Sequence, residues 1–178
     1  MLVVNKTTME VIRRAHTPDF PTADFLHAPA GLAALEAAEV PSKYWKLNVG
    51  ETDIEEMDAG EKATVDAADF PGVMAAKAGQ MSIEVQAYIF ARYDENTQMS
   101  LGFLYKRAVE TGKTNRAAHI APAIDWVLET VLTYFYARKA AICATTNQTG
   151  LDAESWDFST YDASDPEVTI ESALAITD

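Results

Sequence analysis

The sequence predicts an α+β fold, with a small N-terminal β-hairpin and strand module, a long antiparallel helical hairpin and an extended acidic C-terminal arm. Short β-prone runs separated by turn residues occupy the start of the chain. Apolar residues recur at spacings of three and four through the middle, which is the helical period. The end of the chain is acidic and shows no helical stripe. We therefore expect three parts, covering residues 1–70, 71–146 and 147–178.

Composition and charge restrict what the chain can do. Of its 178 residues, 48% are hydrophobic and 10% aromatic, which favours a packed core over a disordered chain. The net charge of −13 is divided as −7, +2 and −8 over the three parts. Because an acidic chain repels a phosphate backbone, nucleic acid is not an expected partner. The apolar runs are too short to span a bilayer and the N-terminus lacks a signal-peptide pattern, so no membrane contact is expected.

The N-terminal module begins with a predicted hairpin. Leu2–Val4 and Glu10–Arg13 are short β-prone runs on either side of Asn5–Thr8, whose residue types favour a turn. Leu32–Ala38 is alanine-rich and predicts a short helix that ends before the next proline. Between these elements prolines keep the chain irregular or extended, at Pro18, Pro21 and Pro29.

A second strand pair and a helix start complete this module. Tyr44–Val49 alternates, with Trp45 and Leu47 on the apolar face, as in a half-buried strand. An acidic turn follows, and Ile54–Met57 is expected to return as the partner strand. The next helix is predicted over Gly60–Ala68. Its start has the pattern of a capping box, formed by Asp58 and Glu61.

The middle of the chain predicts two long helices. Phe70–Gly72 marks the boundary before them. Ser82–Val109 has no proline, but the polar stretch Asp94–Gln98 interrupts its apolar stripe, so this limb is either one helix or two with a kink. Gly112 predicts the turn. The second limb runs to about residue 145, with Pro122 in its first turn or at a kink, and two such limbs should pack antiparallel.

The C-terminal part is expected to be an extended acidic arm with one or two short strands and no third helix. Trp156 and Phe158 alternate in it, and its aspartates and serines separate the apolar residues. The aspartates could suit calcium, but their spacing lacks the glycine and the closing glutamate of an EF-hand, so a solvated arm is the default. These aspartates are Asp152, Asp157, Asp162 and Asp165.

Catalytic and metal-binding signals are weak. The histidines are far apart in sequence and lack partners at metal-ligand spacing, so surface or capping roles are expected for His16, His27 and His119. Asp125 and Glu129 share a helix face and could do acid–base chemistry if a pocket separated their pKa values. A solvated face is the ordinary interpretation of that pair. We expect no enzyme activity, no cofactor and no metal.

The second long helix carries more aromatic surface than one partner helix can hide. Trp126 and the run Tyr134–Tyr136 point in several directions around it. We therefore expect part of this surface to be buried between chains, and the chain to form a homo-oligomer. The candidate interface residues are Trp126, Tyr134 and Tyr136 on this helix, Trp45 and Leu47 in the N-terminal module, and Trp156 and Phe158 in the arm.

Several segments also carry a family resemblance: Met1–Thr8, Tyr44–Leu47, Glu56–Ala68, Gln98–Leu101, Asp125–Val127 and Tyr134–Lys139. They resemble segments of small structural proteins of tailed-phage virions, of the tail-fibre and collar type. In that group a strand ending near Glu-Met leads into a short Glu-Lys-x-x-Val-Asp-Ala-Ala helix. The similarity covers residues 1–68 and, more loosely, 80–145. The acidic arm has no counterpart in it.

The resemblance implies a structural component located in the virion and assembled in the host cytoplasm, with other virion proteins and further copies of itself as partners. The group is defined by its place in the particle, so it implies no catalytic residues and no cofactor. Two alternatives stay open. One is a fibre-assembly chaperone, which would leave the finished particle. The other is a small enzyme that uses Asp125 and Glu129.

Overall fold

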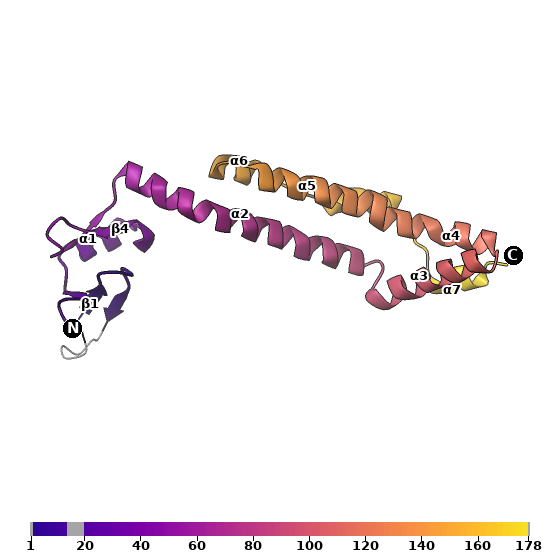
Figure 1. The fold of residues 1–178 in the computed structure, drawn as a ribbon, viewed down its shortest axis with the longest axis horizontal. Helices are drawn as coiled ribbons and strands as arrows, with labels where there is room; N and C mark the ends of the chain where they lie inside the picture. The colour runs from indigo at the N-terminus through magenta and orange to yellow at the C-terminus, as the bar shows by residue number, and fades with distance from the viewer. Residues whose placement is uncertain (1, 14–19, 178) are drawn as a thin grey trace. The chain divides into compact units, whose positions relative to one another are not determined.

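The computed structural model describes residues 2–13 and 20–177, and the chain forms two compact units, residues 1–69 (unit 1) and 70–178 (unit 2). His16 and Pro18 lie outside the described residues. Unit 1 holds all the strands found among these residues, and unit 2 is helical (Figure 1). The predicted α+β class is therefore confirmed, with a small antiparallel sheet followed by a mostly helical body.

The first sheet of unit 1 has three strands in the order β2-β1-β3. β1 (Leu2–Asn5) pairs antiparallel with β2 (Val11–Arg13), which confirms the predicted hairpin. Its turn is held by the Asn5 side chain, which accepts hydrogen bonds from the N–H groups of Thr7 at 2.8 Å and Thr8 at 2.9 Å. β3 (Phe25–His27) pairs with the other edge of β1 and was not predicted, because Pro21 and Pro29 on either side of it favoured an irregular or extended segment.

The second sheet of unit 1 is the predicted strand pair. β4 (Trp45–Leu47) follows a short 3₁₀ turn, η2 (Ser42–Tyr44), and pairs antiparallel with β5 (Ile54–Glu56). The predicted short helix is α1 (Gly31–Ala37). At its start a Cβ on Gly31 would lie 2.0 Å from the Ile54 carbonyl oxygen, so only glycine lets the two backbones approach. The core of this unit contains Val4, Leu26, Leu32, Leu35, Trp45 and Ile54.

The helix predicted over 60–68 is much longer than expected. α2 (Ala59–Phe90) continues through Pro71, so the predicted end of this helix at Ala68 is wrong. A proline removes one backbone N–H and crowds the preceding turn, which need not end a helix that is anchored further along. Met81 and Val85 supply such an anchor, because both are buried in the core of unit 2.

The start of α2 is the predicted capping box. The Asp58 carboxylate accepts a hydrogen bond from the Glu61 N–H at 2.9 Å, and the Glu61 carboxylate accepts one from the Asp58 N–H at 2.8 Å. The Glu61 N–H is the main reason that the pKa of Asp58 lies below its usual value of 3.8. The cap is therefore strongest while Asp58 is ionised.

We expect Asp58→Asn to keep the cap at neutral pH but to remove part of its acid sensitivity. Because the folded-state pKa of Asp58 is lowered, its stabilising effect is present above the unfolded-state pKa and is lost as the pH falls through the folded-state value. Asparagine caps a helix equally well and does not titrate. Thermal unfolding of both proteins followed by circular dichroism should show a smaller loss for Asp58→Asn below about pH 4. An equal loss in both proteins would contradict this role.

The first helical limb is broken, which settles the alternative left open by its sequence. α2 ends at Phe90, and α3 (Glu95–Glu110) begins after a short loop. Asp94 is the N-cap of α3 and accepts a hydrogen bond from the Thr97 N–H at 2.7 Å. Gly112 forms the predicted turn with a φ of 70°, in the left-handed region that favours glycine.

The second helical limb is continuous. It consists of α4 (Thr114–Asp125), the π-helical turn η3 (Trp126–Val131) and α5 (Leu132–Ala144). Pro122 lies in the interior of α4, shortly before the π-helical turn, and not in the first turn. α3 packs against α4, and residues of α2 and α5 share one core, so the predicted antiparallel arrangement of the two limbs is present (Figure 1). None of the helices in the described part of the chain has the length and apolar character needed to cross a membrane.

The prediction of an extended C-terminal arm is wrong. The segment contains α6 (Gln148–Ala153), the 3₁₀ turn η4 (Phe158–Ser164) and α7 (Ile170–Ala175), and no strand among its described residues. It folds back onto the helices because its apolar residues enter the same core. Four of them are buried: Leu151, Phe158, Val168 and Ala173.

Candidate functional site

The C-terminal segment covers the aromatic face that was expected to need another chain. Trp126 is only 4% exposed. Its ring lies 5.9 Å from that of Tyr88 and 6.0 Å from that of Tyr93. Its indole N–H donates to the Tyr161 carbonyl at 3.3 Å and to the Ser164 hydroxyl at 3.1 Å. The expectation that a single chain cannot hide Trp126 is therefore wrong. We call residues 154–168 the C-terminal strap.

Aromatic side chains of the strap complete this cluster. Phe158 is buried, with its ring 5.6 Å from Tyr88 and 5.7 Å from Tyr134. Tyr134 is consequently half-buried. Trp156 is half-buried as well, and its indole N–H donates to the Glu84 carboxylate at 2.5 Å. Tyr136, by contrast, is 62% exposed. Of the three candidates on the second helix, only Tyr136 is left largely open to a partner.

Charged and hydroxyl groups fix the strap to α2 and to the loop that follows it. The Arg92 guanidinium lies 3.9 Å from the centre of the Tyr88 ring, pairs with Asp162, and has its Nε 3.5 Å from a carboxylate oxygen of Asp165. Tyr88 donates its hydroxyl proton to Asp162 at 2.7 Å, and Tyr93 donates to Asp165 at 2.7 Å. These two aspartates are thus engaged by the chain itself. No group of three metal-binding side chains occurs within residues 2–13 and 20–177, so a calcium site has no support there.

The two tyrosines predict a response to alkaline pH. Burial, together with the hydrogen bonds to Asp162 and Asp165, raises the pKa of both Tyr88 and Tyr93 above the usual 10.0. Since the folded-state values are raised, the associated stability is complete below pH 10 and is lost as the pH rises further.

We expect the strap contacts to weaken above about pH 10, as the unfolded state begins to ionise these tyrosines. Urea denaturation between neutral and alkaline pH measures this loss. The double variant Tyr88→Phe/Tyr93→Phe should be less stable at neutral pH, because two hydrogen bonds are removed, but should lose less on going to alkaline pH. A loss as steep as in the unaltered protein would show that other groups cause it.

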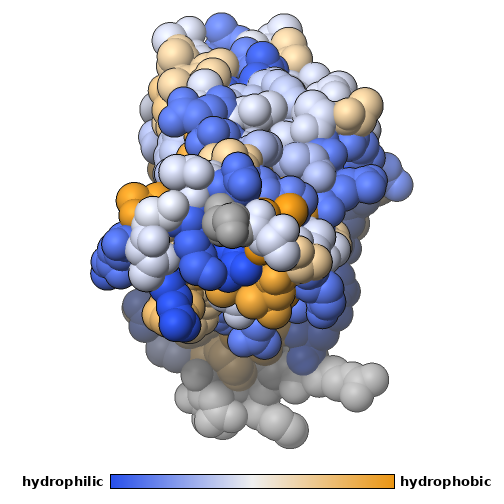
Figure 2. Space-filling model, turned by 90° about the vertical axis from the view of Figure 1, so that its right-hand side faces the viewer, coloured by the Kyte–Doolittle hydropathy of each residue, from blue (hydrophilic) through white to orange (hydrophobic). Residues whose placement is uncertain are grey.

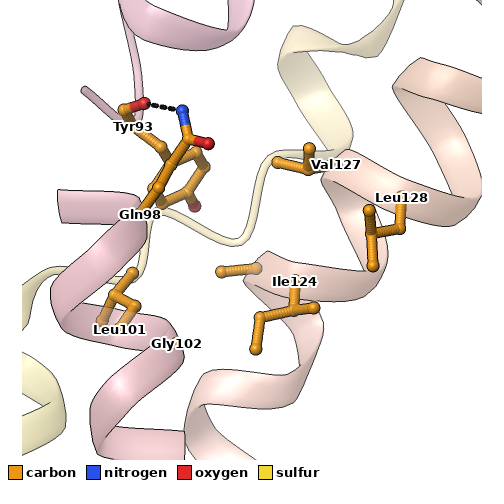
Figure 3. A pocket seen from close by; sticks show the side chains of 8 residues that line it. Tyr93, Gln98, Leu101, Gly102, Ile124, Val127 and Leu128 are labelled. Atoms are coloured by element: carbon orange, nitrogen blue, oxygen red, sulfur yellow. Dashed lines mark hydrogen bonds between the residues drawn. The ribbon is translucent and has the colours of Figure 1, made fainter. Parts of the chain in front are cut away.

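An apolar pocket of about 210 Å³ lies between α3 and the α4–η3 limb (Figure 3). Gln98 closes one end, with its amide N–H donating to the Tyr93 carbonyl at 2.5 Å. Figure 3 shows α3 on one side of the space and Ile124, Val127 and Leu128 on the other. The pocket lies at the π-helical turn, a distortion that is frequent at functional sites. Its lining residues are Tyr93, Gln98, Leu101, Gly102, Ala123, Ile124, Val127 and Leu128.

Large apolar side chains are exposed close to this pocket. On α3, Met99 is 67% and Phe103 63% exposed, and each is next in sequence to a lining residue. Leu128, on the opposite wall, is 53% exposed. Figure 2 views the molecule from the side where α3, α4 and α7 lie in Figure 1, and shows hydrophobic residues emerging between hydrophilic ones. This surface was not predicted, although the spacing of Met99, Gly102 and Phe103 indicates a second apolar stripe on α3.

The remaining interface and catalytic candidates from the sequence do not line this pocket. Trp45 is buried in unit 1, where its indole N–H donates to the Val40 carbonyl at 2.9 Å, and Leu47 is half-buried against the same core. The apolar face that Trp45 and Leu47 share therefore packs against the core of unit 1. Asp125 and Glu129 are both exposed, and neither lines the pocket described above.

Fold and site together define a small α+β protein whose helical unit combines a strap-covered aromatic core with an apolar pocket and exposed apolar side chains. A comparison of the chain with protein-family models, with curated proteins and with solved structures finds no match.

Proposed function

We propose that this chain is a structural subunit of a tailed-phage particle, present in several copies, that acts by packing against sister copies and neighbouring virion proteins. One observation carries the proposal: unit 2 exposes large apolar side chains after its own strap has been packed. Ile83 is 70% exposed and Phe90 41% exposed on α2, in addition to Met99 and Phe103 on α3. Ile83 and Phe90 are seven residues apart and so lie on one face of α2, and an exposed apolar helix face can mark a contact with another macromolecule.

The chemistry of the surface supports packing as the mechanism. The pocket is lined almost entirely by hydrocarbon, with Gln98 as its polar member apart from the Tyr93 hydroxyl. That hydroxyl is already engaged by Asp165. Such a lining favours an apolar side chain as occupant. The resemblance of residues 1–68 to phage virion proteins supplies the kind of assembly.

Quantitative peptide mass spectrometry on purified particles tests the proposal. The chain is expected in the particles at a fixed ratio to the major capsid protein. Its presence in the lysate together with its absence from finished particles would favour an assembly chaperone instead. Its absence from both the particles and the particle-assembly intermediates would refute the proposal.

A surface variant gives the test residue resolution. Ile83→Asp/Phe90→Asp is expected to fold normally, because both side chains are exposed, but to be incorporated at a lower ratio. Gln86→Asp is the matched control, since it adds a charge at an exposed position of the same helix. Equal melting temperatures of the double variant and the unaltered protein would show that misfolding is not the cause of the lower incorporation. Equal incorporation of both variants would exclude this face of α2 from the contact.

A further inference from the structure

We propose that a second pocket of unit 2, between α3, α4 and α7, binds a carboxylate that is carried on a short apolar group. The pocket has a volume of about 240 Å³. It lies at the end of unit 2 where α7 packs against both α3 and α4 (Figure 1). The inference goes beyond the proposed particle function and does not depend on it. The lining includes three cationic residues, Arg107, Lys113 and Arg116, and three apolar ones, Leu104, Ala108 and Leu174.

One helix face and the turn that follows it form most of this pocket. Leu104, Arg107 and Thr111 are spaced by three and four residues, so they share one face of α3 at its C-terminal end. Thr111 donates its hydroxyl proton to the Arg107 carbonyl at 2.8 Å, within the helix. The left-handed turn at Gly112 then reverses the chain and brings Lys113 to the start of α4. The two cations therefore reach the same pocket from opposite sides of one turn.

The folded-back end of the chain forms the remaining wall. The Arg116 guanidinium, which is half-buried, donates to the Leu174 carbonyl at 3.3 Å and to the Ile176 carbonyl at 2.8 Å. These bonds join residues 58 and 60 positions apart and hold α7 and the residues after it against α4. The Leu174 side chain is 54% exposed and lines the pocket. The pocket is thus complete only in the folded unit.

The charge around the pocket favours an anion. Residues 104–124 hold four basic side chains and one acidic side chain, a balance of +3 in a chain whose net charge is −13. The acidic one, Glu110, does not line the pocket, and its carboxylate lies 3.9 Å from the Lys106 ammonium. Among the described residues, Arg107 and Lys113 take part in no ion pair. A concave site with charge of one sign and apolar walls concentrates the potential and attracts a ligand of opposite charge.

The shape and the apolar lining narrow the class of anion. A guanidinium such as that of Arg107 can bind both oxygens of a carboxylate. The hydrocarbon of Leu104 and Leu174 suits an apolar group next to that carboxylate better than a fully hydrated inorganic anion. The volume exceeds that of a cavity of roughly 150 Å³ that holds benzene, but is below the roughly 300–1,000 Å³ of typical small-molecule sites. One short branched or ring-bearing acid therefore fits. A free organic acid and the carboxyl-terminal residue of a protein both have this chemistry.

Nuclear magnetic resonance titration of the full chain with N-acetyl-leucine is the experiment. The backbone amide signals of residues 111–116 are expected to shift and to saturate. N-acetyl-leucinamide, which has the same apolar group and no charge, should bind at least about tenfold more weakly, because a charge-assisted hydrogen bond is lost. Equal binding of the acid and the amide, or the absence of any saturable shift with the acid, overturns the inference.

Two charge-removing variants locate the site. Arg107→Gln and Lys113→Gln should each weaken N-acetyl-leucine binding by about tenfold and leave the melting temperature unchanged, since both side chains are exposed. The matched control is Lys106→Gln, which removes the same charge from an exposed position of α3 outside the lining. Lys106→Gln is expected to bind as the unaltered protein does. An equally large loss in this control would show unspecific attraction by the whole positive surface and would overturn the site.

Further probes test the apolar half of the ligand and its source. N-acetylglycine, which lacks the side chain, should bind about tenfold more weakly than N-acetyl-leucine. Inorganic phosphate that binds as tightly as N-acetyl-leucine would overturn the carboxylate assignment. A hexapeptide with a carboxyl-terminal leucine that binds at least as tightly as N-acetyl-leucine supports the site and identifies a protein terminus as its source. Binding of N-acetyl-leucine without binding of the peptide supports the site and identifies a free organic acid.

Discussion

Trp126→Ala is expected to lower the free energy of unfolding of unit 2 by about 3–5 kcal/mol, the range for truncating a large buried aromatic side chain. The indole is 4% exposed and touches rings from α2 and the loop that follows it, including Tyr88 and Tyr93. The substitution leaves a cavity at the centre of the core and removes the donor to Tyr161 and Ser164. Urea denaturation followed by far-ultraviolet circular dichroism measures the loss.

Tyr136→Ala is the control for this experiment. Its side chain is 62% exposed, so the expected change lies within about 0.5 kcal/mol. If Trp126→Ala behaved like Tyr136→Ala, the indole would not be held by its own chain, and coverage by a neighbouring subunit would again be the better account of the aromatic face.

Phe158→Ala is expected to cost a comparable amount, about 3–5 kcal/mol, and to act mainly by loosening the strap. Phe158 is 6% exposed and lies against Tyr88 and Tyr134. Among the described residues the strap contains no β-strand. Its attachment to α2 and α5 therefore depends on side chains of this kind. Loosening it should expose Trp126 to water.

Hydrogen exchange and limited proteolysis locate this effect. Amides in residues 154–168 are expected to exchange faster in Phe158→Ala, and cleavage should begin there, while unit 1 keeps its protection. Thr160→Ala, at an exposed position of the same strap, should alter neither measurement appreciably. Uniformly faster exchange over both units would mean that the strap and unit 1 unfold together, contrary to their separate cores.

The acidic C-terminal segment forms ion pairs with arginines of the helical body that it covers. Residues 147–178 carry a net charge of −8, and the helices of residues 71–146 carry +2. Arg92 and Arg138 each bind an acidic residue of the strap, Arg92 through Asp162 and Arg138 through Glu154 at 2.6 Å. Part of the acidic charge of this segment thus serves contacts within unit 2.

Features decided by neighbours in sequence could be predicted. The first hairpin follows from Asn5–Thr8, the start of α2 from Asp58 and Glu61, and the turn before α4 from Gly112. In each case the hydrogen bonds or the backbone conformation involve residues within a few positions. The polar interruption of the first limb at Asp94 was also visible, although only the structure decided between one helix and two.

Features that depend on contacts between residues far apart in the sequence could not be predicted. The bond from Tyr88 to Asp162 joins residues 74 positions apart, and that from Tyr93 to Asp165 joins residues 72 apart. Alternation of Trp156 and Phe158 is equally compatible with a strand and with an irregular segment whose rings enter a core. The sequence alone therefore determined which residues are apolar and where local elements begin. The tertiary structure decided which apolar faces meet, because burial depends on chain folding that no local pattern records.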